Sequence, residues 1–132
     1  MVHSKRTKAI AVNLIIFAVL FGLISFNKEV LRPLWAENHL LSILTDVFPN
    51  FIAAFLINLA IVNAILLKKP VRVRLIVLGS SALILAIFVI EEFISLLGAS
   101  TQFDINDIFA SAIGVLLAYL SFELIVTKRN KR

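Results

Sequence analysis

Several features of soluble and of disulfide-stabilised proteins are missing from this sequence. Its 132 residues include no cysteine, which excludes disulfide frameworks, thiolate metal sites and cysteine nucleophiles. Charged residues make up only 16% of the chain, against about a quarter in an ordinary soluble domain. With 4 glycines and 3 prolines there is no room for a low-complexity linker, and a composition that is 61% hydrophobic excludes a disordered chain.

What the sequence has in abundance is hydrophobic side chains, which make up 61% of it and include 11 Phe. The mean hydropathy is +1.02. A soluble domain of this size has too small an interior to bury so many apolar groups. The composition therefore predicts a small integral membrane protein.

Four apolar runs are long enough to cross a bilayer, at about residues 9–26, 50–67, 75–98 and 108–126. We interpret them as helices, because an isolated strand would leave its backbone groups unpaired in lipid. The first run exceeds the apolar core of a signal peptide, so it is predicted to be an uncleaved span. The expected fold is a single all-α domain over 1–132, an integral membrane four-helix bundle.

The basic residues predict how the bundle is oriented. All but Lys28 and Arg32 of the 13 lie in three segments, 5–8, 68–74 and 128–132, which end on one side of the four spans. The positive-inside rule then places both termini in the cytoplasm of a multi-pass protein. The net charge of +5 is explained by this orientation and by anionic lipid, so no nucleic-acid partner is expected.

The opposite, outer side receives every acidic residue except Glu123. Its first connecting segment, 27–49, contains apolar residues at i, i+3, i+4, i+7 and i+8 from Leu40 to Phe48. This spacing predicts a short amphipathic helix over about 37–48, lying flat on the outer surface, with a lid over the bundle as the alternative. Pro49 is then expected in the first turn of the second span, where its missing N–H costs nothing.

Two carboxylates, Glu91 and Glu92, lie inside the third apolar run, near its outer end. One interpretation leaves both at the interface with no further role; the other turns at least one toward the bundle, in an outward-facing polar pocket. Adjacent helical positions are about 100° apart, so the two cannot share one direction. Each lies on a helical stripe that includes a serine, so the periodicity does not choose between them.

The fourth run begins with Asp104 and Asp107. Asp104 has the position of a helix-capping carboxylate, whereas Asp107 begins a stripe of small residues on one helical face. Small side chains let another helix approach closely, and Ala60 and Ala64 make the second span the expected partner. The helix-packing stripe consists of Ser111, Gly114, Ala118 and Ser121.

Other polar groups carry no distinct chemistry. Asn13, Asn58 and Asn63 are interpreted as hydrogen-bonding links between helices. His3 and His39 fall on opposite sides of the predicted membrane, so no shared metal site is expected. Without a phosphate-binding loop or a hydrolase motif, we expect no cofactor, and the sequence does not decide if the protein is an enzyme.

The order of residues over about 49–118 resembles the VanZ-like family, small bacterial membrane proteins named after a teicoplanin-resistance protein. Glu92, Asp104, Asp107 and Gly114 match the family pattern, and the segment Phe48-Pro-Asn-Phe51 is also similar to it. Three positions depart from that pattern: Ser95 replaces a common Gln, Thr101 an Arg, and Ser111 an Asn. Losing the Arg removes the natural bidentate partner of Asp104 or Asp107.

The resemblance implies a bacterial plasma-membrane protein connected with glycopeptide resistance or cell-envelope homeostasis, and it favours Glu92 over Glu91. Our leading hypothesis is a protein that acts through an outward acidic pocket on an envelope lipid or a glycopeptide-related ligand. The alternatives are a membrane enzyme acting on an envelope precursor, and a structural subunit with a membrane-protein or homo-oligomeric partner. The candidate pocket residues are Glu91, Glu92, Ser95, Asp104 and Asp107.

Overall fold

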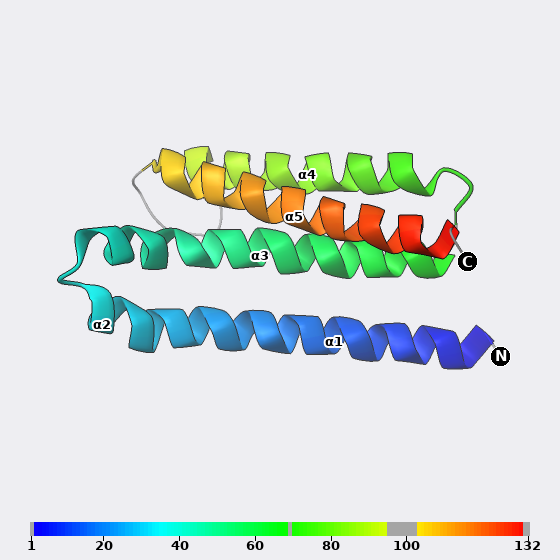
Figure 1. The fold of residues 1–132 in the computed structure, drawn as a ribbon, viewed down its shortest axis with the longest axis horizontal. Helices are drawn as coiled ribbons and strands as arrows, with labels where there is room; N and C mark the ends of the chain where they lie inside the picture. The colour runs from blue at the N-terminus through cyan, green and yellow to red at the C-terminus, as the bar shows by residue number, and fades with distance from the viewer. Residues whose placement is uncertain (1, 69, 95–102, 131–132) are drawn as a thin grey trace.

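The computed structural model describes residues 2–68, 70–94 and 103–130, and its regular structure there is entirely helical (Figure 1). Four helices of this part are long and apolar enough to cross a membrane, which confirms the predicted all-helical fold with four long apolar helices. A π-helical turn and a single α-helical turn continue the first of them. The elements are α1 (Val2–Phe26), η1 (Asn27–Leu31), α2 (Arg32–Trp35), α3 (His39–Lys68), α4 (Val73–Ile94) and α5 (Ile105–Asn130).

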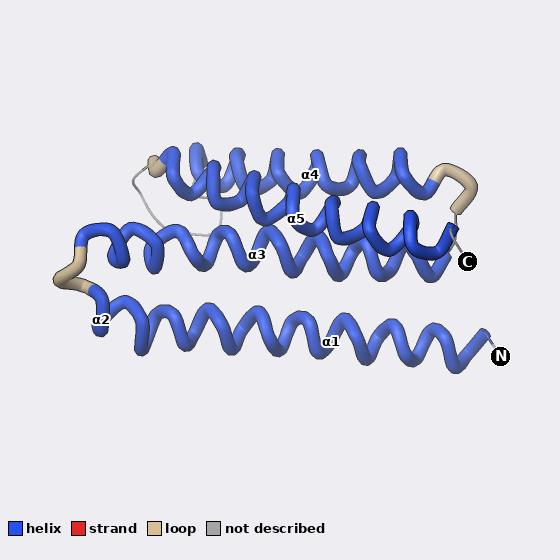
Figure 2. The backbone as a smooth tube through the Cα atoms, viewed as in Figure 1, coloured by secondary structure: helices blue, strands red, loops and turns tan. Residues whose placement is uncertain are grey.

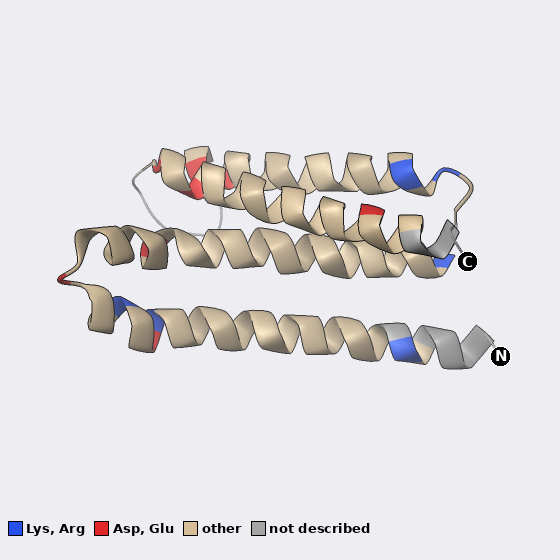
Figure 3. Ribbon diagram, viewed as in Figure 1, with Lys and Arg blue, Asp and Glu red and all other residues tan. Residues whose placement is uncertain are grey.

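The charged residues separate to the two ends of this helical array (Figure 3). Both termini and the α3–α4 turn lie at one end, which carries Lys8, Lys68, Arg72 and Arg74 and is called the basic end below (Figures 1 and 2). Arg74 there forms an ion pair with Glu123, with 3.2 Å between Nη2 and Oε2. The opposite, acidic end carries the turn after α2 and the beginning of α5.

α3 is the central helix, with α1 on one side and α4 and α5 on the other (Figure 1). Among the described residues, α1 contacts α3 and η1, and makes no contact with α4 or α5. The predicted four-helix bundle is therefore wrong in its packing, because only α3, α4 and α5 pack mutually. Buried apolar side chains of the described part form three clusters. One lies between α1 and α3 and consists of Leu20, Ile52 and Leu56. The other two lie among α3, α4 and α5 and consist of Ala54, Ile84 and Val115, and of Val62, Val77 and Phe122.

The segment predicted as a separate surface helix is the first part of α3, which runs unbroken for 30 residues from His39. Asn38 caps it, since its Oδ1 accepts a hydrogen bond from the Leu41 N–H at 3.2 Å. At about 1.5 Å per residue, α3 is roughly 45 Å long and exceeds a ~30 Å hydrocarbon layer. The helix over 39–48 is real, but the predicted break before the second span is wrong.

Pro49 consequently lies in the interior of α3, not in a first turn. A proline there has no N–H to offer the carbonyl four residues earlier, which belongs to Thr45. The Asn27 side chain fills that gap, because its Nδ2 donates to the Thr45 carbonyl at 2.8 Å, and both residues are buried. A side chain from η1 thus supplies the hydrogen bond that the proline removes, which explains how α3 continues through Pro49.

The π-helical turn η1 also places Arg32 against α3. The Arg32 backbone N–H bonds to the Asn27 carbonyl, closing the wider turn. Its guanidinium lies 3.5 Å from the Asp46 carboxylate and donates to the Asp46 carbonyl at 3.3 Å. Residues 27 and 32 therefore hold the end of the first span to the beginning of α3.

Candidate functional site

Glu92, near the end of α4, reaches the beginning of α5. Its Oε1 accepts a hydrogen bond from the Asp104 backbone N–H at 2.5 Å. That N–H is one of the unpaired donors at a helix start, where a carboxylate also meets the positive end of the helix dipole. Glu92 thus joins two helices that the sequence separates by a connecting segment.

Asp104 has the capping role that its position predicts. Its Oδ1 accepts a hydrogen bond from the Asn106 N–H at 2.8 Å, and its carbonyl accepts one from the Asp107 N–H at 3.2 Å. The first turn of α5 is therefore held by two carboxylates, one from its own chain segment and one from α4. Asp104 itself is half-buried.

Asp107, in the first turn of α5, is the point at which these groups meet. Its carboxylate is half-buried, forms a side-chain hydrogen bond with Asn50 of α3, and lies close enough to Glu92, Asp104 and Asp46 to interact with them electrostatically. We call Glu92, Asp104 and Asp107 the acidic cluster. The structure brings together these three residues, which the sequence singled out, at the acidic end.

Two further predicted residues have different outcomes. Glu91 is half-buried on α4, one position before Glu92 and about 100° around the helix from it. Ser95 lies outside the described residues, as does Thr101, the position of the family Arg. The structure thus pairs α5 with Glu92, the carboxylate that the resemblance favours.

Asn50 is the member of the site that sequence reasoning missed. Asn50 follows Pro49 directly. Because Pro49 was interpreted as the start of a helix, Asn50 was assigned to the boundary between two segments. Once α3 is a single helix, Asn50 lies one turn beyond Asp46 on the same face. The spacing of four residues between Asp46 and Asn50, which places both on one helical face, was the sequence signal that could have identified Asn50.

The small-residue stripe packs α5 against α3, as predicted, and fixes the position of Asp107. A Cβ on Gly114 would meet the Phe51 carbonyl oxygen and would lie 3.0 Å from the Phe55 nitrogen. Ser111 and Ala118 are buried as well. Ser121 is the exception, since it is half-exposed with its hydroxyl bonded to the Leu117 carbonyl, and the buried position in that turn belongs to Phe122.

A polar link deeper in the array holds α3, α4 and α5 in register. Asn58 is fully buried and donates from Nδ2 to the Ser81 hydroxyl at 3.0 Å and to the Val115 carbonyl at 3.3 Å. The Ser81 hydroxyl in turn lies 3.1 Å from the Asn58 Oδ1. Asn63 donates to Asn13 of α1 at 2.8 Å, so all three asparagines link helices as predicted.

The acidic cluster offers hydrogen-bond acceptors and negative charge, and its chemistry follows from that. No Lys, Arg or His of the described residues forms an ion pair with Glu92, Asp104 or Asp107. Within the same residues no group of three or more His, Cys, Asp or Glu is arranged to hold a metal ion. The arrangement suits recognition of a positively charged or hydrogen-bond-donating group.

Comparison with protein-family models, with curated proteins and with solved structures finds no match to this chain. The fold defines only the class of protein: its described residues include four helices that are long and apolar enough to cross a membrane. The resemblance to the VanZ-like family remains a prediction made from the sequence.

Proposed function

We propose that this chain is a small integral membrane protein of the bacterial cell envelope, of the VanZ-like kind, which acts through the acidic cluster on its outer side. In this role it contributes to glycopeptide resistance or to envelope homeostasis by engaging an envelope component at the membrane surface. The basic end faces the cytoplasm in this arrangement, following the positive-inside rule.

One observation carries the proposal: three carboxylates that the sequence spreads over two spans meet at the beginning of α5. Carboxylates near a span end are costly to keep in an apolar setting, and capping alone would need only Asp104. Glu92 reaches this helix start from α4, and Asp107 belongs to its first turn, so two carboxylates remain beside the capping residue. The close contact of Gly114 with the α3 backbone, two turns after Asp107, holds this part of α5 against α3.

The test uses charge-removing substitutions that keep shape. In cells that depend on this protein for resistance to a lipid-bearing glycopeptide, Glu92→Gln and Asp107→Asn should each abolish the protection while the protein still inserts and accumulates. The two together should be no worse than either alone, because the groups act as a unit.

Glu91→Gln is the matched control, since it removes the same charge one position earlier on α4. It should leave most of the protection in place. Full protection with Glu92→Gln at normal abundance would overturn the proposal and leave the carboxylates with a capping role.

A further inference from the structure

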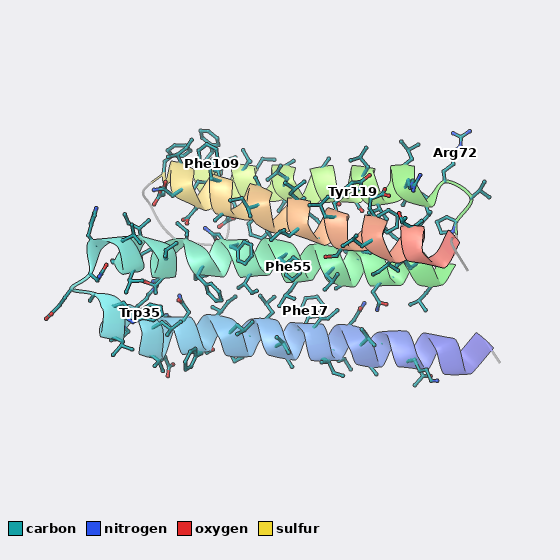
Figure 4. All side chains as sticks on the ribbon, viewed as in Figure 1. Phe17, Trp35, Phe55, Arg72, Phe109 and Tyr119 are labelled. Atoms are coloured by element: carbon teal, nitrogen blue, oxygen red, sulfur yellow. The ribbon has the colours of Figure 1, made fainter. Side chains whose placement is uncertain are left out.

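The short connection from α3 to α4 lies at the basic end and carries exposed cations. Lys68 ends α3, Arg72 directly precedes α4, and both side chains are exposed. Figure 4 shows the Arg72 side chain directed away from the helices. Neither residue forms an ion pair with any described residue, whereas Arg74 is paired with Glu123. Two positive charges of this connection are therefore available to a partner outside the chain.

α1 brings a third cation to the same level. The hydrogen bond between Asn13 and Asn63 fixes the register of the antiparallel helices α1 and α3. Lys8 is five residues before Asn13 and Lys68 five residues after Asn63, so the two lie at about the same height along the helix axes. Lys8 is exposed and forms no ion pair with the described residues. The cations thus surround the ends of several helices and do not form a patch on one face.

The length of α4 determines how deep its first residues lie. Its 22 residues extend ~33 Å, little more than a ~30 Å hydrocarbon layer. When α4 crosses a bilayer, both of its ends therefore lie among the lipid headgroups, and so does the connection that precedes it. Val71 is the tip of this connection and is fully exposed, at 102%. An apolar side chain without a protein neighbour is more favourably placed between lipids than in water.

Helix stability does not explain the cations at this position. α4 has no acidic residue in its first turn, and Arg72 and Arg74 lie directly before it and within it. A cation at a helix start meets the positive end of the helix dipole, which is unfavourable. An anion outside the chain would offset this repulsion, so the charge pattern fits an anionic partner.

We propose that Lys68, Val71 and Arg72, called the basic turn, form a membrane anchor that binds anionic phospholipid headgroups. The ammonium and guanidinium groups bind phosphate oxygens, and the Val71 side chain lies between the headgroups. The occupant is the lipid leaflet, because the turn lies at headgroup depth and the neighbouring cations surround the helix ends. The inference goes beyond the proposed function, since it concerns the opposite end of the molecule. It needs only that α4 crosses a bilayer, in either direction.

The experiment measures which lipids contact the basic turn. Trp35, the single tryptophan of the chain, lies at the opposite end from Arg72 (Figure 4). Trp35→Phe with Val71→Trp moves the fluorophore to the basic turn of the full chain, which is placed in vesicles of equal parts phosphatidylcholine and phosphatidylglycerol. Brominating one lipid or the other should show about a fivefold excess of phosphatidylglycerol at the turn, as one cation near an anionic surface predicts.

Two conditions sharpen this measurement. In 1 M sodium chloride, where the Debye length is about 3 Å, the excess should disappear. Trp35 in the natural chain should report no excess, because acidic residues outnumber cations at its end. Absence of quenching by either brominated lipid, or equal quenching by both at low salt, would overturn the proposal.

Charge-removing variants test the two cations. Lys68→Gln together with Arg72→Gln should abolish the excess, and Arg72→Lys should retain it. Lys28→Gln is the matched control, because it removes an exposed cation at the acidic end, and it should leave the excess unchanged. Inorganic phosphate should compete no better than sodium chloride of equal ionic strength, since the lipid also contacts Val71. An excess that survives the double substitution, an excess that Lys28→Gln abolishes, or selective competition by phosphate would each contradict the anchor.

These readouts are independent of any resistance phenotype. A phosphatidylglycerol excess at the basic turn, combined with intact resistance in Glu92→Gln cells, would preserve this inference and overturn the proposed function. Equal quenching by the two lipids combined with lost resistance would do the reverse.

Discussion

At the scale of single residues, several polar side chains of the helices have a specific partner on a neighbouring element. Asn27 is the clearest case, because the carbonyl that it satisfies is the one that Pro49 leaves unpaired. A buried carbonyl without a partner costs about 1–3 kcal/mol, and lipid offers no replacement donor. The hydrogen bond from Asn27 therefore contributes to the free energy of unfolding mainly because Pro49, four residues after Thr45, leaves the Thr45 carbonyl without a backbone donor.

This dependence gives a double-mutant prediction. Asn27→Leu should destabilise the protein by about 1–2 kcal/mol in the natural chain, because the Thr45 carbonyl loses its donor. In a Pro49→Ala background the cost should fall to less than half, since residue 49 then supplies its own backbone N–H. Equilibrium unfolding in mixed detergent micelles, followed by circular dichroism, measures both values.

Asn63→Leu is the control for this cycle. It removes a hydrogen bond between α3 and α1, the one to Asn13, which involves no carbonyl freed by a proline. Its cost should be the same in the natural chain and in the Pro49→Ala background. An equal loss for Asn27→Leu in both backgrounds would show that the two residues are independent.

At the scale of elements, composition and run length predicted the four long apolar helices, because a run of about 20 apolar residues favours a helix long enough to cross a bilayer. Boundaries were less predictable where a side chain far along the sequence decides them. Pro49 looked like a helix start, and only the contact with Asn27 shows why α3 continues through it. The pairing of Asp107 with Asn50 was missed for the same reason, since it depends on α3 being one helix.

Helix pairing was predictable where it depends on residue size. Ala60 and Ala64 correctly indicated the second span as the partner of α5, and Gly114 allows the two backbones to approach. Where the small-residue stripe ends was not predictable, since Ser121 and Phe122 are neighbours and only the packing shows that Phe122 is buried.

A pair of glycines tests this contact. Gly114→Ala should destabilise the array by about 1–3 kcal/mol, because the added methyl meets the α3 backbone, which cannot yield as a flexible side chain would. Gly79→Ala should be neutral or stabilising by up to about 1 kcal/mol, since nothing lies within 4 Å of its Cβ position and alanine favours a helix. Unfolding in detergent compares the two directly, and equal costs would place α5 further from α3 than the structure does.

At the scale of the whole molecule, the array consists of a packed group of α3, α4 and α5 with α1 attached along one side of α3. A sequence with four similar apolar runs suggests a closed bundle, since nothing in the runs themselves says which faces meet. The separation of charge is a different kind of property, visible both in the sequence and along the length of the molecule (Figure 3). It is the feature from which the orientation in the membrane can be tested.

The absence of cysteine makes this test clean, because a single introduced thiol is then the only site for a maleimide. Val71 is fully exposed in the α3–α4 turn at the basic end, and Glu37 is exposed in the turn before α3 at the acidic end. In intact cells a membrane-impermeant maleimide should label Glu37→Cys, whereas Val71→Cys should react only after permeabilisation, because basic turns are retained in the cytoplasm. The reverse pattern would turn the acidic cluster toward the cytoplasm and would overturn an outward-facing site, although every packing contact described above would stand.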